Sequence, residues 1–207
     1  MHRSHSTLGT PLRVADLPIE TEALARALVG LSLGVRSREG IVGGRIVEVE
    51  AYLPESDPAS HAYRGQTPRN AAMFGPPFHA YVYFIYGNHW CLNLTSEAAG
   101  TGAAVLLRAL EPLAGIDVMQ ARRAGQPLRD LARGPGRLAQ ALAIAGDDNG
   151  AAVGPRRRIC LYDPGLAARV VASPRVGISS AKDLPLRFTL AGSRFVSSPL
   201  PRLRAMV

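Results

Sequence analysis

The chain contains few of the residues that indicate a metal site, a disulfide framework or a bound nucleotide. Its two cysteines, Cys91 and Cys160, do not have the spacing of zinc ligands and are too few for a disulfide framework, so we expect both to be small buried apolar residues. Its five histidines show neither i,i+4 pairing nor a His-Glu-x-x-His motif. A glycine-rich nucleotide-binding loop is also absent. The sequence therefore predicts no metal and no cofactor.

Long apolar runs are missing as well. No run reaches the ~18 residues that span a membrane, and the N-terminus lacks the apolar stretch of a secretory signal. We therefore expect no membrane contact and a cytoplasmic location, in bacteria the cytoplasm or nucleoid. No repeat or long linker divides the 207 residues, and a hydrophobic content of 47% supports a folded core. We expect a monomer with a single domain over residues 15–207, preceded by a flexible arm over residues 1–14.

Lysine is almost absent, although the chain is strongly basic. Only Lys182 is a lysine among 24 basic residues; the net charge is +8 and the isoelectric point is about 10.3. Such a charge indicates an acidic partner such as nucleic acid, whose phosphates the planar guanidinium group can contact. A coding bias toward GC-rich DNA would equally favour arginine, and many basic proteins bind nothing acidic.

The hydrophobic pattern predicts one domain of mixed α/β (α+β) class. Helices are expected near residues 16–31, 113–124 and 135–145, and strands near residues 41–52, 80–86, 89–95, 102–110, 156–162, 174–178, 186–191 and 194–197. Gly87-Asn88 is a strong hairpin signal between two of these strands. The proline-containing stretch 53–70 is expected to be an ordered loop.

Two segments carry the chemical signal. Side chains alternate between the faces of a strand, so Glu48, Glu50 and Tyr52 should share one face. The segment 81–86 then supplies half of the six tyrosines. Acidic and aromatic residues on one face can be a solvated sheet surface. A carboxylate facing a cluster of aromatic rings also suits a site that stacks a planar, electron-poor base and activates water beside it.

Two further features are less specific. Arg108 interrupts an apolar strand, where a charge is costly unless it is paired, so a buried salt bridge is one explanation. Arg133-Gly134-Pro135-Gly136-Arg137 precedes a predicted helix, and free amides at a helix N-terminus bind phosphate. Glycine-proline helix starts are common, however, and do not by themselves indicate a ligand.

These motifs together resemble the alkyladenine (3-methylpurine) DNA glycosylase family. The resemblance covers roughly residues 15–198 and includes several motifs of six or more residues. The matching segments are Arg45–Tyr52, His61, Gln66–Asn70, Met73–Phe74, Tyr81–Gly87, Cys91–Asn93, Val105–Pro112, Gly134–Pro135, Leu138–Ile144, Arg175–Gly177 and Pro185–Phe188. The family implies a curved, mainly antiparallel sheet with flanking helices and a protruding β-hairpin that enters the DNA minor groove.

The resemblance also implies roles for individual residues. Glu50 corresponds to the general base, with Glu48 as the rival on the same strand face. Arg108 corresponds to the arginine that holds the attacking water and a nearby phosphate. The residues that match the base-binding pocket are Tyr52, His61, Tyr83 and Asn93, although Asn93 would equally suit a simple hairpin hydrogen bond.

The hairpin tip has a role of its own in the family. Tyr86 corresponds to the wedge that fills the gap left by a flipped nucleotide; alternatively it packs on a neighbouring loop. Phe84, Asn88 and Trp90 lie where the family varies, and we expect them to influence lesion preference.

The sequence therefore predicts a monofunctional DNA glycosylase. It would flip alkylated or deaminated purines out of double-stranded DNA and hydrolyse the N-glycosidic bond, as in base excision repair. The first alternative is a non-catalytic nucleic-acid-binding protein on the same fold, with tyrosines that stack single-stranded bases. A hydrolase of free nucleosides fits the pocket but not the hairpin tyrosine or the net charge.

Overall fold

The computed structural model describes residues 7–85 and 87–198. The α-helices are α1 (Thr21–Leu28), α2 (Ile116–Arg122) and α3 (Pro135–Leu142). The strands are β1 (Thr10–Pro11), β2 (Ser32–Ser37), β3 (Gly40–Tyr52), β4 (Ala80–Ile85), β5 (His89–Thr95), β6 (Ala104–Ala114), β7 (Ile159–Asp163), β8 (Val170–Ser173) and β9 (Arg187–Leu190). None of the helices within this described part is long and apolar enough to cross a membrane.

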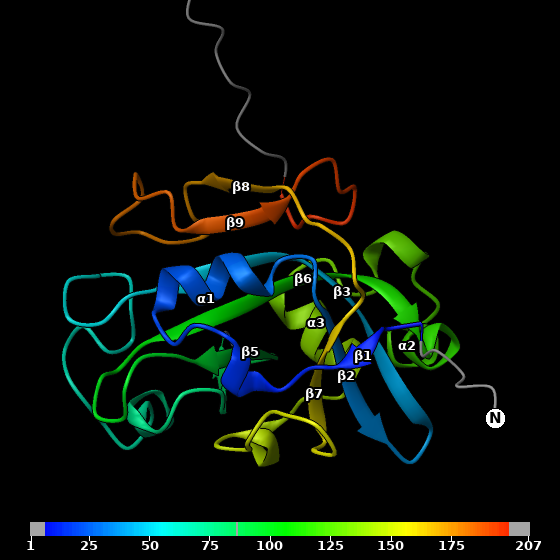
Figure 1. The fold of residues 1–207 in the computed structure, drawn as a ribbon, viewed down its shortest axis with the longest axis horizontal. Helices are drawn as coiled ribbons and strands as arrows, with labels where there is room; N and C mark the ends of the chain where they lie inside the picture. The colour runs from blue at the N-terminus through cyan, green and yellow to red at the C-terminus, as the bar shows by residue number, and fades with distance from the viewer. Residues whose placement is uncertain (1–6, 86, 199–207) are drawn as a thin grey trace, which may run out of the picture.

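The strands form one open, curved sheet around the long strand β3 (Figure 1). Its order is β1-β7-β2-β3-β6-β5-β4, and β9 joins β3 beside β8. Every pair of these strands is antiparallel. The prediction of a mixed α/β domain with a mainly antiparallel sheet is therefore confirmed.

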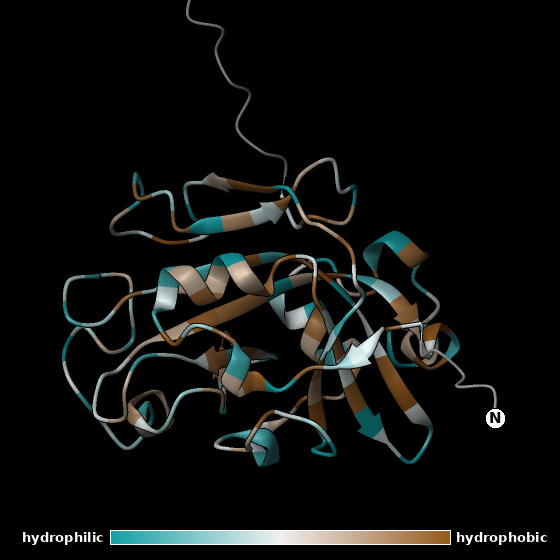
Figure 2. Cartoon of the chain, in the orientation of Figure 1, coloured by the Kyte–Doolittle hydropathy of each residue, from teal (hydrophilic) through white to brown (hydrophobic). Residues whose placement is uncertain are grey.

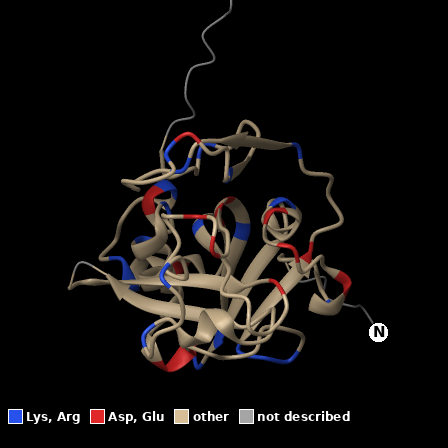
Figure 3. Cartoon of the chain, turned by 90° about the vertical axis from the view of Figure 1, so that its left-hand side faces the viewer, with Lys and Arg blue, Asp and Glu red and all other residues tan. Residues whose placement is uncertain are grey.

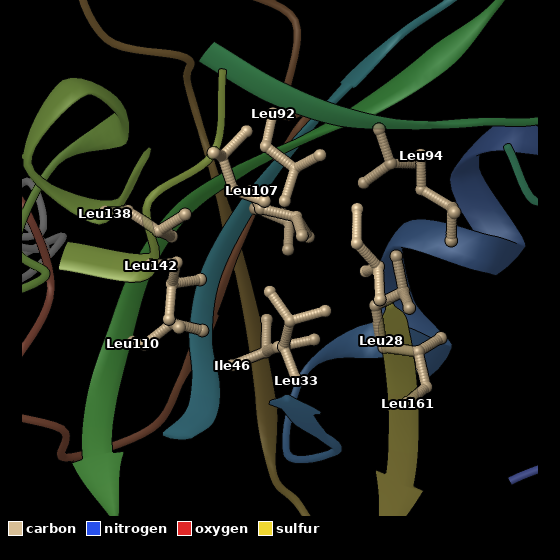
Figure 4. Packing of buried hydrophobic residues seen from close by; sticks show 14 of the residues in the cluster. Leu28, Leu33, Ile46, Leu92, Leu94, Leu107, Leu110, Leu138, Leu142 and Leu161 are labelled. Carbon is tan, nitrogen blue, oxygen red and sulfur yellow. The ribbon is translucent and has the colours of Figure 1, made fainter. Parts of the chain in front are cut away.

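One face of the sheet forms the main hydrophobic core. Apolar residues point to this face at alternate positions of the strands, so the sheet is hydrophobic along much of its length (Figure 2). Helices α1 and α3 cover this face, and side chains of both belong to the same cluster of leucines (Figure 4). The buried members of this cluster on β3, β5 and β6 are Val42, Ile46, Val49, Ala51, Leu92, Leu94, Val105, Leu107 and Leu110. The intervening residues are consequently directed to the opposite face.

The pairing of β3 with β6 is interrupted twice beside Arg108. Ile46 pairs with Leu110 and Glu48 with Ala109, which leaves Val47 without a partner in the register. Val49 then pairs with Leu107, which leaves Arg108 as the extra residue on the other strand. Such bulges bend a strand and redirect a side chain, and they are common next to active sites.

The first helix is shorter than predicted. Residues Val14–Asp16 form a separate 3-10 helix, and α1 begins only at Thr21. Leu17 is extended because the ring of Pro18 disfavours helical geometry in the residue before it. The proline therefore separates two short helices rather than opening one long helix.

The C-terminal strands also differ from the prediction. The strands expected at 174–178 and 194–197 are absent from the described structure, and β8 lies at Val170–Ser173 instead. Residues 174–178 are a loop whose backbone bonds a side chain of β3, as described below.

The described part of the predicted N-terminal arm, residues 7–14, contacts the rest of the domain. Thr10 and Pro11 form β1 and pair with β7, and the side chain of Leu8 is fully buried. Residues 8–14 therefore pack on the domain, while the exact domain boundary stays a prediction.

The predicted hairpin is formed by β4 and β5. The last pair is Ile85 with His89, and the Asn88 amide donates to the Ile85 carbonyl at 3.3 Å. Gly87 has a φ of +70°, which favours glycine. Tyr86 lies outside the described residues. The insertion of this hairpin into DNA stays a prediction.

Candidate active site

A cavity of about 550 Å³ lies on the sheet face opposite the leucine core. Its walls include nine of the residues that the sequence singled out: Tyr52, His61, Tyr83, Asn93, Arg108, Arg133, Gly134, Gly136 and Arg137. Glu50 lies directly behind the wall, and Tyr86 is outside the described residues. The fold thus assembles one site from segments far apart in the sequence.

Strand alternation explains how the sheet builds this wall. On β5, Leu92 and Leu94 enter the core, whereas Cys91 and Asn93 line the cavity. On β6, Leu107 enters the core between cavity residues Leu106 and Arg108. The same strands therefore supply both the core and the site.

Glu50 is fully buried and is held by three donors. The Tyr52 hydroxyl and Arg108 Nη1 each donate to Oε2 at 3.0 Å, and the Val176 amide donates to Oε1 at 2.7 Å. All three donor residues line the cavity, although Glu50 itself does not. Glu50 is therefore one hydrogen bond away from the cavity.

Glu48 is also fully buried, but its surroundings differ. Its Oε1 accepts from Arg187 Nε at 2.7 Å, Arg108 Nε at 3.2 Å and the Ser197 hydroxyl at 2.8 Å. Its Oε2 accepts from the Ser197 amide. None of the atoms of Glu48, Arg187 or Ser197 lines the cavity, so this carboxylate is engaged in holding the structure together.

Arg108 connects the two carboxylates. The buried cluster of Glu48, Glu50, Arg108 and Arg187 contains two negative and two positive side chains, which compensates the cost of burying each charge. Burial lowers the pKa of Arg108, but Glu50 and then Glu48 raise it by more, so the net pKa is raised. Arg108 therefore combines the buried salt bridge expected for an arginine in an apolar strand with a place on the cavity wall.

Aromatic rings form another part of the wall. The His61 ring lies edge-on to Tyr83, with 4.6 Å between centroids, and its Nδ1 is 2.9 Å from the Tyr81 hydroxyl. Burial, followed by the charge of Arg69, lowers the pKa of His61. Burial raises the pKa of Tyr81 to about 12 and raises that of Tyr83 still further. The rings are consequently uncharged at neutral pH.

The loop that carries His61 is held by Asn70. The buried Asn70 side chain donates to the carbonyls of His61 at 2.8 Å and Gly65 at 3.0 Å, and it accepts from the Thr67 amide at 2.6 Å. The Asn70 side chain therefore holds residues 61–70 together, which are the last part of the predicted ordered loop.

Asn93 makes the hairpin hydrogen bond and also lies on the cavity wall. Its Nδ2 donates to the Tyr81 carbonyl across the hairpin at 2.9 Å, and the residue lines the cavity. This bond holds the Asn93 amide against the backbone of β4, and a role of Asn93 in base binding stays a prediction.

The start of α3 forms the edge of the cavity. The Gly134 amide donates to the Arg108 carbonyl at 3.0 Å, so this amide is not free for a phosphate. Arg133 donates to the Val196 carbonyl at 2.8 Å, and both Arg133 and Arg137 lie within 3.5 Å of Asp130. A Cβ on Gly136 would come within 2.8 Å of the His89 ring, so the hairpin and α3 are in close contact here.

Phe84 and Trp90 lie away from the cavity wall, and their expected influence on lesion preference stays a prediction. The rings of Phe84 and Trp90 contact each other with 4.8 Å between centroids, and neither residue lines the cavity. Each alternates with a cavity-facing neighbour on its strand, so both lie on the other face of the hairpin.

Several cavity residues were not predicted from the sequence. Tyr81, His89 and Cys91 follow from alternation with Tyr83 and Asn93, and this signal was present in the sequence. The segment Val176–Ser179 lies far along the chain from Glu50, and no local pattern indicates its position. Within residues 7–85 and 87–198, no group of three His, Cys, Asp or Glu side chains is arranged to hold a metal ion.

Comparison with known proteins agrees with the resemblance seen in the sequence. Residues 16–194 match the family model described as methylpurine-DNA glycosylase. Three similar proteins are each named "Putative 3-methyladenine DNA glycosylase". The protein of Koribacter versatilis is 48% identical over 202 residues (95% of this chain, 98% of the relative). The Burkholderia cenocepacia protein is 52% identical over 164 residues (77% and 79%), and the Methanoculleus marisnigri protein is 52% identical over 182 residues (86% and 94%). With a family match over most of its length and relatives at about half identity, the chain belongs to the methylpurine-DNA glycosylase family.

Proposed function

We propose that this protein removes damaged purines from double-stranded DNA by hydrolysing the N-glycosidic bond. The substrate class is alkylated or deaminated purine, of the 3-methyladenine type named for its relatives. The lesion would be flipped out of the duplex into the cavity, whose volume of about 550 Å³ lies within the range of small-molecule sites. The product is a free base and an abasic site in an intact strand.

The observation that carries this proposal is the setting of Glu50. Its carboxylate is buried, is held by three donors and is separated from the cavity only by those donors. A carboxylate in this position acts as the general base for a water molecule that reaches the wall between Tyr52 and Arg108. Glu48 does not suit this role, because its oxygens accept from four donors, and three of these belong to Arg187 and Ser197, which do not line the cavity.

The aromatic wall supports the choice of base. Tyr52, His61 and Tyr83 offer flat surfaces to a purine ring, and a methylated purine carries a positive charge. Stacking on neutral π systems adds a cation–π attraction of about 0.5–2 kcal/mol for such a base. His61 suits this role because burial and the charge of Arg69 lower its pKa and keep it neutral.

The edge of the cavity supports a DNA backbone contact. Arg133 and Arg137 lie beside the start of α3, and Arg137 is about half exposed. Basic residues also occur on other parts of the molecule (Figure 3). In this proposal Tyr86, next to the β4–β5 turn, fills the space left by the flipped nucleotide.

A non-catalytic nucleic-acid-binding protein is the alternative. It would use the same rings and arginines, but it has no need for a buried carboxylate held one hydrogen bond from a cavity. Burying a carboxylate is costly unless it is paired, and all three residues that donate to Glu50 line the cavity.

Base release from defined duplexes distinguishes the two functions. Protein is incubated with duplexes that contain one hypoxanthine or ethenoadenine, with methylated duplex DNA, and with an undamaged duplex of the same sequence. We expect alkali-labile sites only in damaged DNA, appearing at the position of the lesion. Tight binding to all of these duplexes without any alkali-labile site would support the non-catalytic alternative.

A further inference from the structure

Arg175 and Asp57 form a buried ion pair close to Glu50. Both side chains have no exposed surface, and they make two hydrogen bonds, of 2.5 Å from Nη1 and 2.8 Å from Nη2. Asp57 also accepts from the backbone amides of Leu53 and Ala59. The pair therefore fixes the loop after β3 to the segment that begins at Arg175. Removing both charges from water is costly, and this cost can exceed the attraction between them. A gain in stability is therefore a weak explanation for the presence of this buried pair.

The other contacts of Arg175 converge on the end of β3. Its Nη1 donates to the Ala51 carbonyl at 2.9 Å. Its guanidinium carbon lies 4.7 Å from the centroid of the Tyr52 ring, the distance of a cation–π contact. Ala51 and Tyr52 are the two residues that follow Glu50 in the chain.

Two of the three donors to Glu50 depend on this arrangement. Tyr52, whose ring contacts the guanidinium group, donates its hydroxyl to Oε2. Val176, the neighbour of Arg175 in the chain, donates its amide to Oε1 at 2.7 Å. The carbonyl of Val176 also accepts from Arg108 Nη1 at 3.5 Å. Arg175 itself does not line the cavity.

We propose that Arg175 is a positioning residue of the reaction, which holds the Tyr52 ring and the Val176 amide so that both bond the Glu50 carboxylate. The inference rests on the proposed function, because it requires Glu50 to be the general base. A lysine in its place would keep the charge but would lose the planar group that contacts Asp57, Ala51 and Tyr52 at the same time.

The first experiment compares Arg175→Lys with Arg158→Lys. Arg158 is a control with the same kinds of hydrogen bonds, because it also makes two bonds to one aspartate, Asp148, and donates to the carbonyls of Arg36 and Ala143, but its side chain is 40% exposed. It does not line the cavity. Single-turnover excision is measured at saturating protein, and rates are normalised to the fraction of protein that binds a duplex with an abasic-site analogue.

We expect Arg175→Lys to lower the normalised rate by about 10- to 100-fold, since small displacements in a catalytic group have effects of this order. Binding of the analogue duplex should change by less than about threefold, and Arg158→Lys should keep the wild-type rate. A merely structural role would reduce the binding-competent fraction but not the normalised rate, and that result would overturn the proposal. If Arg175→Lys yields no binding-competent protein, Asp57→Glu, which keeps both charges and shifts the carboxylate by one methylene group, is held to the same expectation.

A double-mutant cycle with Tyr52→Phe tests the route of the effect. Phenylalanine keeps the ring against Arg175 and removes the hydroxyl that bonds Glu50. If Arg175 acts partly through this hydroxyl, Arg175→Lys should lower the rate several-fold less in the Tyr52→Phe background than in the wild type. Fully additive effects would contradict the proposed route. A wild-type rate for Arg175→Lys alongside an inactive Glu50→Gln variant would overturn this inference alone, whereas an active Glu50→Gln variant would overturn the proposed function itself.

Discussion

Replacing Glu50 by glutamine should lower the single-turnover rate of base release by about 10²–10⁴-fold, which is the usual contribution of a general base. Glutamine keeps the shape of the side chain and an acceptor for the Val176 amide, but it does not take up a proton from water. We expect affinity for a lesion duplex to persist, because Glu50 lies behind the cavity wall. The measurement is excision of ethenoadenine from a duplex at saturating protein, with binding measured separately.

Glu48→Gln is the matched control on the same strand, and the structure predicts the opposite result. Three donors converge on Oε1 of Glu48 and one on Oε2, so an amide NH₂ group would face a donor in either orientation. The loss of this charge also leaves Arg187 without its carboxylate partner. We expect the free energy of unfolding to fall by about 3–5 kcal/mol, the cost of breaking a buried ion pair.

The two variants therefore separate catalysis from stability. Glu50→Gln should lose about 1–3 kcal/mol of stability, less than Glu48→Gln, because Arg108 keeps Glu48 as a partner and reaches the cavity. The rate per folded molecule of Glu48→Gln should stay within about tenfold of the wild type. Near-normal turnover by Glu50→Gln together with an inactive, folded Glu48→Gln protein would refute the assignment.

Three further predictions concern pH, salt and the reaction product. Because burial lowers the pKa of His61, its imidazole binds a proton less tightly in the folded state than in the unfolded state. The free energy of unfolding should therefore fall as pH drops through about 6.5. Urea unfolding between pH 8 and 5 should show this dependence of stability on pH, and the His61→Gln variant should show a weaker one. If DNA binding uses phosphate contacts, affinity should fall steeply between about 50 and 200 mM salt, and a flat profile in a filter-binding titration would favour a small-molecule substrate. Lys182 and the N-terminal amine are the only candidate amines, and Lys182 is not among the described residues that line the cavity, so we expect no β-elimination. Borohydride trapping of a protein–DNA adduct would disprove this, and Lys182→Ala would then show which amine was responsible.

Strands and their faces could be predicted because they depend on local patterns. The alternation of Glu48, Glu50 and Tyr52 predicted that both carboxylates lie on one side of β3, and both do contact Arg108. The hairpin between β4 and β5 followed from Gly87-Asn88 in the same way. These elements needed no information from distant parts of the chain.

The rest of the site depends on contacts between distant segments. The bulge that makes Arg108 an extra residue on β6 is a property of two paired strands, and neither strand encodes it alone. Residues 174–178 look like a strand by composition, yet they form a loop because the Val176 amide bonds Glu50 instead of a neighbouring strand. The roles of Glu50, Arg108 and the pocket residues in catalysis stay predictions.

The shared sheet limits how the lengths of its strands can vary among relatives. Side chains alternate with a period of two, so the insertion or deletion of one residue in β5 would exchange its two faces. Cys91 and Asn93 would then enter the leucine core, and Leu92 and Leu94 would enter the cavity. A change of two residues keeps each side chain on its face, and a bulge is the place where a single extra residue is accommodated. Viable length variants of these strands should therefore differ by even numbers of residues, except where a bulge such as the one at Arg108 is gained or lost.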